Sequence, residues 1–238
     1  MTKGQKRNKK REAIVGLEYV MKPAVRTAEE VAMALVKPEE ISPDGSSRQR
    51  PQRDIYYQAS IMAGKDGLIG EIAERVAQRC EVTNHPLKTV CVIDGAASLS
   101  KAVKRQFKNP VIVLDIIHVL ERFWTAAHLF HKESSDEARE MVYDLLLRTL
   151  NGKIGYVIGG LKQRGTKHKL SAHKQKLLQQ VLTYLNNHRD QMHYGQYLEA
   201  GYPIATGVVE SACGHLVKDR MEKSGARWKI EGAEAMLR

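Results

Sequence analysis

The sequence predicts an α/β protein, chiefly because of two short apolar runs near the middle of the chain. The first run reads VCVIDG and ends at Asp94 and Gly95. The second reads VIVLDIIH and occupies residues 111–118. Both are rich in β-branched residues, as the buried strands of a parallel sheet are. An amphipathic segment at 98–107 separates them, which predicts a strand–helix–strand unit with parallel strands.

The residues before this unit predict two more strands and two helices. Residues 11–21 and 55–63 are apolar enough to be strands. Thr27 is a good helix N-cap with acidic residues in the following turn, so a helix is expected from there to the proline-rich stretch 38–53. That stretch is expected to be a loop. Residues 66–80 place their apolar side chains on one face, which predicts the second helix.

Beyond residue 117 the hydrophobic pattern takes the helical period and keeps it. Helices are expected near 117–130, 135–151, 171–189 and 206–222. The glycines of the stretch 152–160 are expected to separate helices. Thr206 is a plausible N-cap for the last helix.

Composition and cysteine usage predict a cytoplasmic protein that contacts no membrane. The chain has 238 residues, of which 42% are hydrophobic, so it can bury a core of its own. No apolar run approaches the roughly 20 residues that span a bilayer, and no signal peptide is recognisable. The three cysteines, an odd number, lack a CxxC spacing and are expected to be reduced thiols.

The charge of the chain favours a polyanionic partner. The formal net charge is +11 and the pI is about 9.5. General solubility could explain a basic chain, but the charges are clustered, with dense basic runs in the first eleven residues and in residues 162–176. Such runs can neutralise the phosphates of nucleic acid. The side chains expected to contact DNA are Lys162, Arg164, Lys167, Lys169, Lys174, Lys176, Lys218 and Arg220.

Each of the two apolar strands ends on a carboxylate, and both acids have two interpretations. Asp94 with Gly95 is a candidate metal ligand at the carboxyl end of a strand, although Asp-Gly also occurs in turns without chemistry. Asp115 and His118 have a spacing that can place them on one face of a starting helix. Alternatively, Asp115 is the N-cap of that helix and His118 packs beneath it.

A third acid, Glu210, lies far downstream within TGVVESACGHLVKDR. Its neighbours are small or apolar, so a glutamate here is costly to bury unless it meets a cation. A solvated glutamate near a helix N-terminus, favoured by the helix dipole, is the alternative. Acids from two strands and a helix could converge on two divalent cations, Mg²⁺ or Mn²⁺, that act in phosphoryl transfer.

At these residues the chain resembles the DDE-type transposases of bacterial insertion sequences, specifically the ISKra-like group. The similar text runs from about Lys10 to the end of the chain. Its most specific pieces are IDGA at 93–96, LDIIHVLE at 114–121, GYVIGGL at 155–161 and the whole of 200–238. The resemblance implies an RNase H-like core with an α-helical insertion before the last catalytic acid.

The resemblance also implies roles for individual residues. Asp94 matches the second catalytic Asp of the family, and Glu210 matches its catalytic Glu. Asp115 with His118 matches the supporting C/DxxH motif. The implied activity is two-metal cleavage and strand transfer of DNA at insertion-sequence ends, and the implied partners are that DNA, target DNA and further copies of the chain in a homo-oligomer.

The implied layout divides the chain into four parts. Residues 1–11 would be a basic leader and 12–120 a partial RNase H-like core. Residues 121–200 would be the helical insertion, and 201–238 would return the catalytic helix to the core.

The chain departs from the family at both ends. The resemblance places a first catalytic Asp on a strand upstream of 11–21, but the ten residues before that segment contain no acid. Asp44 and Asp54 are poor substitutes because they lie in or beside the proline-rich stretch. The last residues, 236–238, read as the middle of a helix. We therefore expect an incomplete core without its first strand, and a catalytically defective chain.

Two other functions remain open at this stage. The chain could be a non-catalytic DNA-binding fragment, for which the basic runs would suffice. It could also be an RNase H-like nuclease, which would use the same acids and differ from a transposase only in its substrate.

Overall fold

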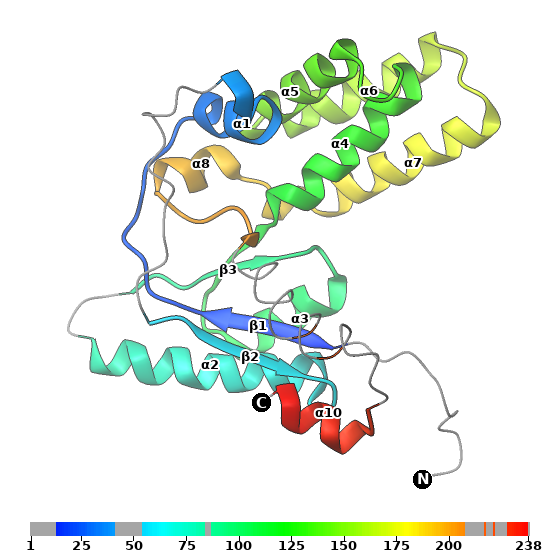
Figure 1. Ribbon diagram of the computed structural model, residues 1–238. Coiled ribbons are helices and arrows are strands. Elements are labelled where there is room, and N and C mark those ends of the chain that lie inside the picture. The colour runs from blue at the N-terminus through cyan, green and yellow to red at the C-terminus, as the bar shows by residue number, and fades with distance from the viewer. Residues whose placement is uncertain are drawn as a thin grey trace.

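The computed structural model combines a bundle of helices with a smaller region of short strands (Figure 1). It describes residues 13–40, 54–83, 87–207, 217, 221 and 228–237. Long helices α4 to α7 form the bundle, and the strands with α2, α3 and α10 lie below it in Figure 1. The α/β class predicted from the sequence is confirmed at this level.

The four strands within the described residues form two separate pairs. Strands β1 (Ile14–Glu18) and β2 (Tyr56–Ser60) are antiparallel, with Ile14 opposite Ser60. Strands β3 (Val90–Ile93) and β4 (Val111–Leu114) are parallel, with Val90 opposite Val111. Among the described residues no hydrogen bonds join one pair to the other. The predicted strand–helix–strand unit with parallel strands is confirmed in β3, α3 and β4.

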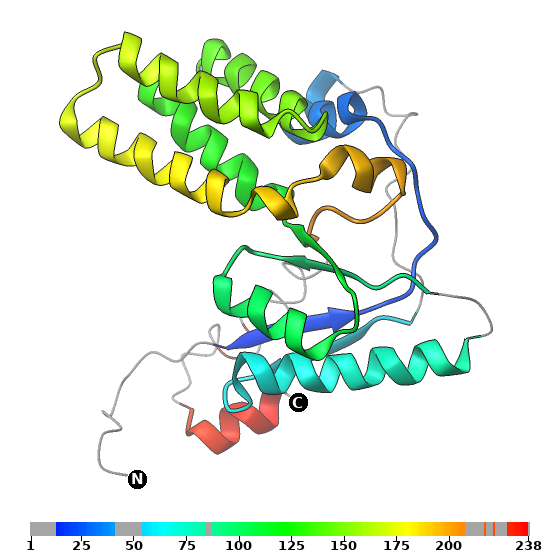
Figure 2. The same cartoon turned by 180° about the vertical axis from the view of Figure 1, so that it is seen from behind.

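Two helices link the strand pairs through a common layer. Helix α2 (Gly64–Val82) packs against β1, β2 and α3 (Ala97–Gln106), and α3 packs against β3. Figure 2 shows α2 and α3 side by side below β3. A small apolar cluster lies here, with Ile69, Ile93, Ala102 and Val103 buried.

The large core lies within the helical bundle. Its helices are α4 (Ile116–Phe130), α5 (Asp136–Leu150), α6 (Ile154–Lys167) and α7 (Ala172–Asn187), with α8 (Tyr194–Glu199) beside them. Helix α1 (Ala28–Val36) packs on α5. Thr27 caps α1 as predicted and forms a capping box with Glu30. Apolar side chains on the inward face of every bundle helix are buried, and this burial stabilises the bundle.

Two sequence predictions change in this region. Residues 152–160 do not separate helices throughout, because α6 begins at Ile154 and contains three of the glycines. Burial of Val157 and Leu161 in the core outweighs the low helix propensity of glycine. The predicted loop 38–53 begins with a single 3₁₀ turn, η1 (Pro38–Glu40), and its remainder lies outside the described residues. The same holds for most of the predicted helix 206–222.

Helix α10 (Ile230–Leu237) ties the end of the chain to β2 through a buried carboxylate. The Glu234 carboxylate accepts hydrogen bonds from the Ser60 hydroxyl at 2.8 Å and from the backbone N–H groups of Ile61 and Met62 at 2.8 and 3.2 Å. These donors compensate for the hydration that the carboxylate loses on burial. A short 3₁₀ turn, η2 (Arg189–Gln191), links α7 to α8. None of the described helices is long and apolar enough to cross a membrane.

Candidate catalytic acids and a basic helical surface

The two strand-end acids lie next to each other at one edge of the β3–β4 pair. Asp94 directly follows Ile93, Asp115 directly follows Leu114, and Ile93 pairs with Leu114. The Asp115 backbone N–H donates to the Ile93 carbonyl at 2.8 Å, so the pairing continues to the acids themselves. The structure therefore brings together the two acids that the sequence predicts at the carboxyl ends of neighbouring strands.

Asp115 is a buried helix cap. Its side chain is 0% exposed, and Oδ1 accepts the Ile117 backbone N–H at 3.0 Å at the start of α4. The second oxygen, Oδ2, lies 3.2 Å from His118 Nδ1 and accepts the hydroxyl of Thr206. The N-cap interpretation of Asp115 is thus confirmed. Because both oxygens have protein partners, Asp115 can hold its neighbours in place but has little capacity left for a cation.

Asp94 has the opposite environment. It is exposed, and its Oδ1 accepts the Ala96 backbone N–H at 2.8 Å. Gly95 has φ +88° and allows the sharp turn after the strand. A Cβ at position 95 would lie 2.8 Å from atoms of Leu114 and Tyr184, so glycine is required here for space as well as conformation. The turn presents the Asp94 carboxylate to solvent.

Two side chains at the C-terminal end of α7 line the same turn, and the sequence did not single them out. The Tyr184 hydroxyl lies 3.4 Å from the Asp94 carbonyl oxygen. His188 Nε2 lies 2.7 Å from the Gly95 carbonyl oxygen, and Nδ1 lies 2.7 Å from that of Tyr184. The Arg122 guanidinium lies over the Tyr184 ring at 4.7 Å. The spacing of Tyr184 and His188 on one helical face was the available signal, but it does not indicate which strand they meet.

The electrostatics around Tyr184 show that several carboxylates gather here. Burial raises the pKa of the Tyr184 hydroxyl to about 12, and the carboxylates of Asp94, Asp115 and Glu121 act in the same direction. The positive charge of Arg122 opposes them. The Tyr184 hydroxyl therefore interacts electrostatically with three carboxylates and one guanidinium group. Charged side chains are concentrated at this edge of the sheet.

The donor set fits a divalent cation only in part. Carboxylate oxygens are the ligands that Mg²⁺ and Mn²⁺ prefer, and Asp94 supplies an exposed carboxylate. Within the part of the chain that the structure describes, no three His, Cys, Asp or Glu side chains gather closely enough to hold a metal ion. Glu210, the other predicted ligand, lies outside the described residues.

The chain leaves the described region close to the buried acid. The Ile116 backbone N–H donates to the Ile204 carbonyl at 2.9 Å, and Ile204 is buried. Two residues later the Thr206 hydroxyl reaches Asp115. The start of the segment that carries Glu210 is therefore fixed at the N-terminus of α4.

The predicted basic surface lies on α6, α7 and the loop between them. Its six described members, Lys162, Arg164, Lys167, Lys169, Lys174 and Lys176, are all exposed residues. Two of them also have protein partners. Arg164 contacts Met141 and lies 5.8 Å from the centre of the Phe130 ring, and Lys174 Nζ donates to the Leu129 carbonyl at 2.8 Å. Lys218 and Arg220 lie outside the described residues.

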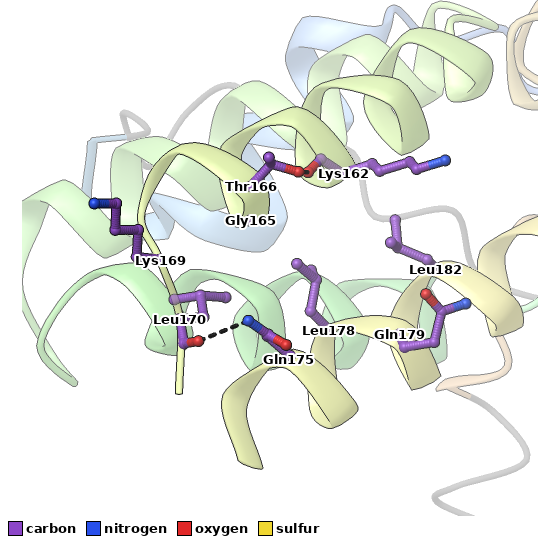
Figure 3. Close-up of a pocket in the computed structure, with 9 residues that line it drawn as sticks. All are labelled: Lys162, Gly165, Thr166, Lys169, Leu170, Gln175, Leu178, Gln179 and Leu182. Carbon is purple, nitrogen blue, oxygen red and sulfur yellow. Dashed lines mark hydrogen bonds between the residues drawn. The ribbon is translucent and has the colours of Figure 1, made fainter. Parts of the chain in front are cut away.

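A cavity of about 500 Å³ opens between α6 and α7 within this surface. Figure 3 shows Lys162 and Lys169 at its opposite ends, with Leu178 between them. Gly165 forms part of the wall. A Cβ at this position would lie 2.3 Å from the Leu178 side chain, so the glycine leaves room for it. The surface thus combines an apolar centre with positive charges at its ends.

Comparison with known proteins found no relative of this chain. No family model, no curated protein and no solved structure matches the chain. The resemblance to transposases therefore depends on the sequence motifs alone.

Proposed function

We propose that this chain is a catalytic-domain fragment of a DDE-type transposase of the ISKra-like group. In this proposal Asp94 and Glu210 are the metal ligands for cleavage and strand transfer of DNA at insertion-sequence ends. The observation that carries it is the exposed Asp94 carboxylate at the carboxyl end of a parallel strand pair, beside the buried Asp115. The RNase H-like core and the homo-oligomer implied by the resemblance belong to the same proposal.

Chain length supports a shared site for Asp94 and Glu210. Thr206 contacts Asp115, which is the neighbour of Asp94 in the strand register. Glu210 follows Thr206 by four residues, and four residues of extended chain span at most about 14 Å between Cα atoms. This spacing is compatible with the shared site that the proposal requires.

The residues would divide the chemistry between them. Asp94 and Glu210 would hold Mg²⁺ or Mn²⁺, which when bound would activate the attacking oxygen and stabilise the leaving one. Asp115 would keep its buried hydrogen bonds and position the start of the Glu210 segment.

Cation binding tests the ligand assignment directly. Mn²⁺ affinity is measured by electron paramagnetic resonance for the unmodified chain and for Asp94→Asn and Glu210→Gln. We expect at least a tenfold loss in each variant, because each removes a charged ligand. Asp144→Asn is the matched control, since Asp144 is exposed on α5 and pairs with Arg148. Equal Mn²⁺ affinity in all four proteins would contradict the proposed metal site.

Cleavage provides the second test. Terminal-repeat DNA is incubated with the chain and Mn²⁺, and nicking is followed on denaturing gels. We expect weak nicking that Asp94→Asn abolishes. Robust nicking by the chain would show that the acids present are sufficient, and nicking that persists in Asp94→Asn would exclude Asp94 as a catalytic residue.

A non-catalytic DNA-binding fragment is the second candidate, and the exposed lysines of α6 and α7 favour it. Fluorescence anisotropy with duplex DNA at 50–200 mM salt measures how affinity falls with ionic strength. We expect Lys162→Gln with Lys169→Gln to weaken binding and reduce the salt slope by about one per lost phosphate contact. A chain that binds DNA but no Mn²⁺ would favour this candidate over the transposase fragment.

A further inference from the structure

One face of helix α7 carries uncharged polar side chains behind a single lysine. Lys176, Gln180, Thr183 and Asn187 follow one another at intervals of four, three and four residues. At about 100° per residue, these positions lie within about 60° of one another around the helix. All four residues are exposed, and all four line an open pocket of about 480 Å³. We call these four residues the amide face.

The amide face ends beside the turn that carries Asp94. Tyr184 and His188 line the same pocket. The Tyr184 hydroxyl lies 3.4 Å from the Asp94 carbonyl oxygen, and His188 Nε2 lies 2.7 Å from the Gly95 carbonyl oxygen. Figure 1 shows the corresponding end of α7 next to β3. A molecule held along the amide face would therefore lie next to the exposed Asp94.

The charge around the amide face is complementary to a polyanion. Residues 145–189, which include all of α6 and α7, contain no aspartate or glutamate and nine lysines and arginines. Six of the nine form the basic surface described above, and Lys176 belongs to both sets. The other three are Arg148, Lys153 and Arg189. A phosphate backbone would be attracted to this part of the chain.

The aromatic ring in the pocket is poorly placed to stack on an unpaired base. The Arg122 guanidinium lies over the Tyr184 ring at 4.7 Å, and the centre of the His188 ring lies 4.4 Å from that of Tyr184. Proteins that hold single strands offer open aromatic rings for stacking. The amide face offers hydrogen-bonding groups instead, which are what base edges in the major groove of a duplex require.

The spacing of the two exposed amides matches the spacing of base pairs. Gln180 and Asn187 are separated by seven residues, which span about 10.5 Å of helix, and three base-pair steps of duplex DNA span about 10 Å. Between them lies Thr183, whose hydroxyl accepts a hydrogen bond from Gln179 at 3.2 Å. Glutamine and asparagine amides can each make two hydrogen bonds to N6 and N7 of adenine.

We propose that the amide face reads the base sequence of duplex DNA through the major groove. Gln180 and Asn187 are its specificity-determining residues, and each contacts one adenine. Lys176 binds a phosphate next to the bases that are read. This inference rests on DNA being the partner, as in both functions proposed above. It adds that the helix beside Asp94 selects a sequence as well as neutralising phosphates.

Selection from a library of duplexes with about twelve randomised base pairs tests the proposal. The unmodified chain should enrich duplexes with two adenines about three base pairs apart. Gln180→Ala should lose the preference at one adenine and Asn187→Ala at the other, each preference being roughly fivefold or more. Lys176→Gln should weaken the binding of selected and unselected duplexes alike, because a phosphate contact carries no sequence information.

Two matched variants control for the loss of an exposed amide. Gln163 and Asn186 are exposed and lie outside the residues that line this pocket, so Gln163→Ala and Asn186→Ala should select the same sequence as the unmodified chain. Three results would overturn the proposal: no enriched bases, an unchanged preference in the double variant of Gln180 and Asn187, or tighter binding of a single strand than of its duplex.

Mn²⁺ affinity, measured on the same proteins, separates this inference from the proposed catalytic site. The variants of the amide face should bind Mn²⁺ as the unmodified chain does. A chain that binds Mn²⁺ and duplex DNA without base preference would overturn the inference alone. A chain that selects adenines through these amides but binds no Mn²⁺ would support the inference and contradict the metal site. Absence of duplex binding would overturn both.

Discussion

Asp94 and Asp115 end neighbouring strands of almost identical character, yet their environments are opposite. Asp94 is exposed and precedes a tight turn at Gly95, whereas Asp115 is fully buried and has three hydrogen-bonding partners. The residue that follows each acid accounts for the difference. Gly95 allows a sharp turn that leaves the Asp94 carboxylate in solvent. Ile116 instead starts a helix, and Asp115 caps its first turn. An acid at a strand end is therefore a better ligand candidate when its carboxylate is exposed, as in Asp94, than when it is buried with protein partners on both oxygens, as in Asp115.

The largest expected contrast is in stability. Asp115→Ala should lower the free energy of unfolding by about 3 kcal/mol, because it removes a helix cap and leaves buried donors without an acceptor. Asp94→Ala should cost less than about 0.5 kcal/mol, since Asp94 is exposed. Urea denaturation measures both. Equal losses would show that the two acids have the same structural role.

Alkaline pH should destabilise the fold, because buried thiol and phenol groups around the β3–β4 pair would have to ionise. Burial raises the pKa of the Cys91 thiol to about 12, above its ordinary 9.0, and the Tyr184 hydroxyl is raised to about 12 as well. In the unfolded chain these groups ionise first, so stability is full below about pH 9 and falls as the pH rises towards 12. Cys91 alone should contribute up to about 1.4 kcal/mol per pH unit, and the partly exposed Tyr184 less.

Urea denaturation at pH 8, 10 and 11 measures this decline. Cys91→Ala is the matched variant and should flatten the curve, although it costs some packing at every pH. A slope that is unchanged in Cys91→Ala would contradict the assignment of the decline to this thiol.

The link between the buried acid and the Glu210 segment should be weaker but specific. Thr206→Val removes the hydroxyl that donates to Asp115 and should cost about 1 to 2 kcal/mol. Thr206→Ser keeps the hydroxyl and should cost less. If the proposed site is correct, Mn²⁺ affinity should fall in Thr206→Val and recover in Thr206→Ser. A loss of stability without a loss of Mn²⁺ affinity would show that Thr206 supports the fold but not the proposed metal site.

The smallest effect is expected at the turn that presents Asp94. His188→Ala removes the side chain that contacts the Gly95 carbonyl and should cost about 1 kcal/mol. His188→Gln can still donate to that carbonyl and is the conservative control. Backbone exchange rates at 94–96 measure whether the turn loosens. No change at these amides would show that the strand end is rigid without His188.

Local sequence patterns predicted much of the fold but little of the site environment. The β3–α3–β4 unit was predicted because periodicity, β-branched residues and length agree over 88–115. The helical glycines of α6 were misread because their tertiary packing is not visible in local propensity. The positions of Asp94 and Asp115 at one sheet edge followed from the strand pattern. The burial of Asp115 did not, because its partners include Thr206, which is distant in sequence.

The buried carboxylate of Glu234 has a consequence for the order of folding. It bonds to Ser60 across 174 residues of chain, so the contact closes a very long loop. Contacts of this separation form late, because the entropy of closing the loop opposes them. During synthesis, the backbone donors at the end of β2 cannot bond to the Glu234 carboxylate until residue 234 has been translated. The antiparallel β1–β2 pair is therefore among the first elements to be translated and among the last to be completed.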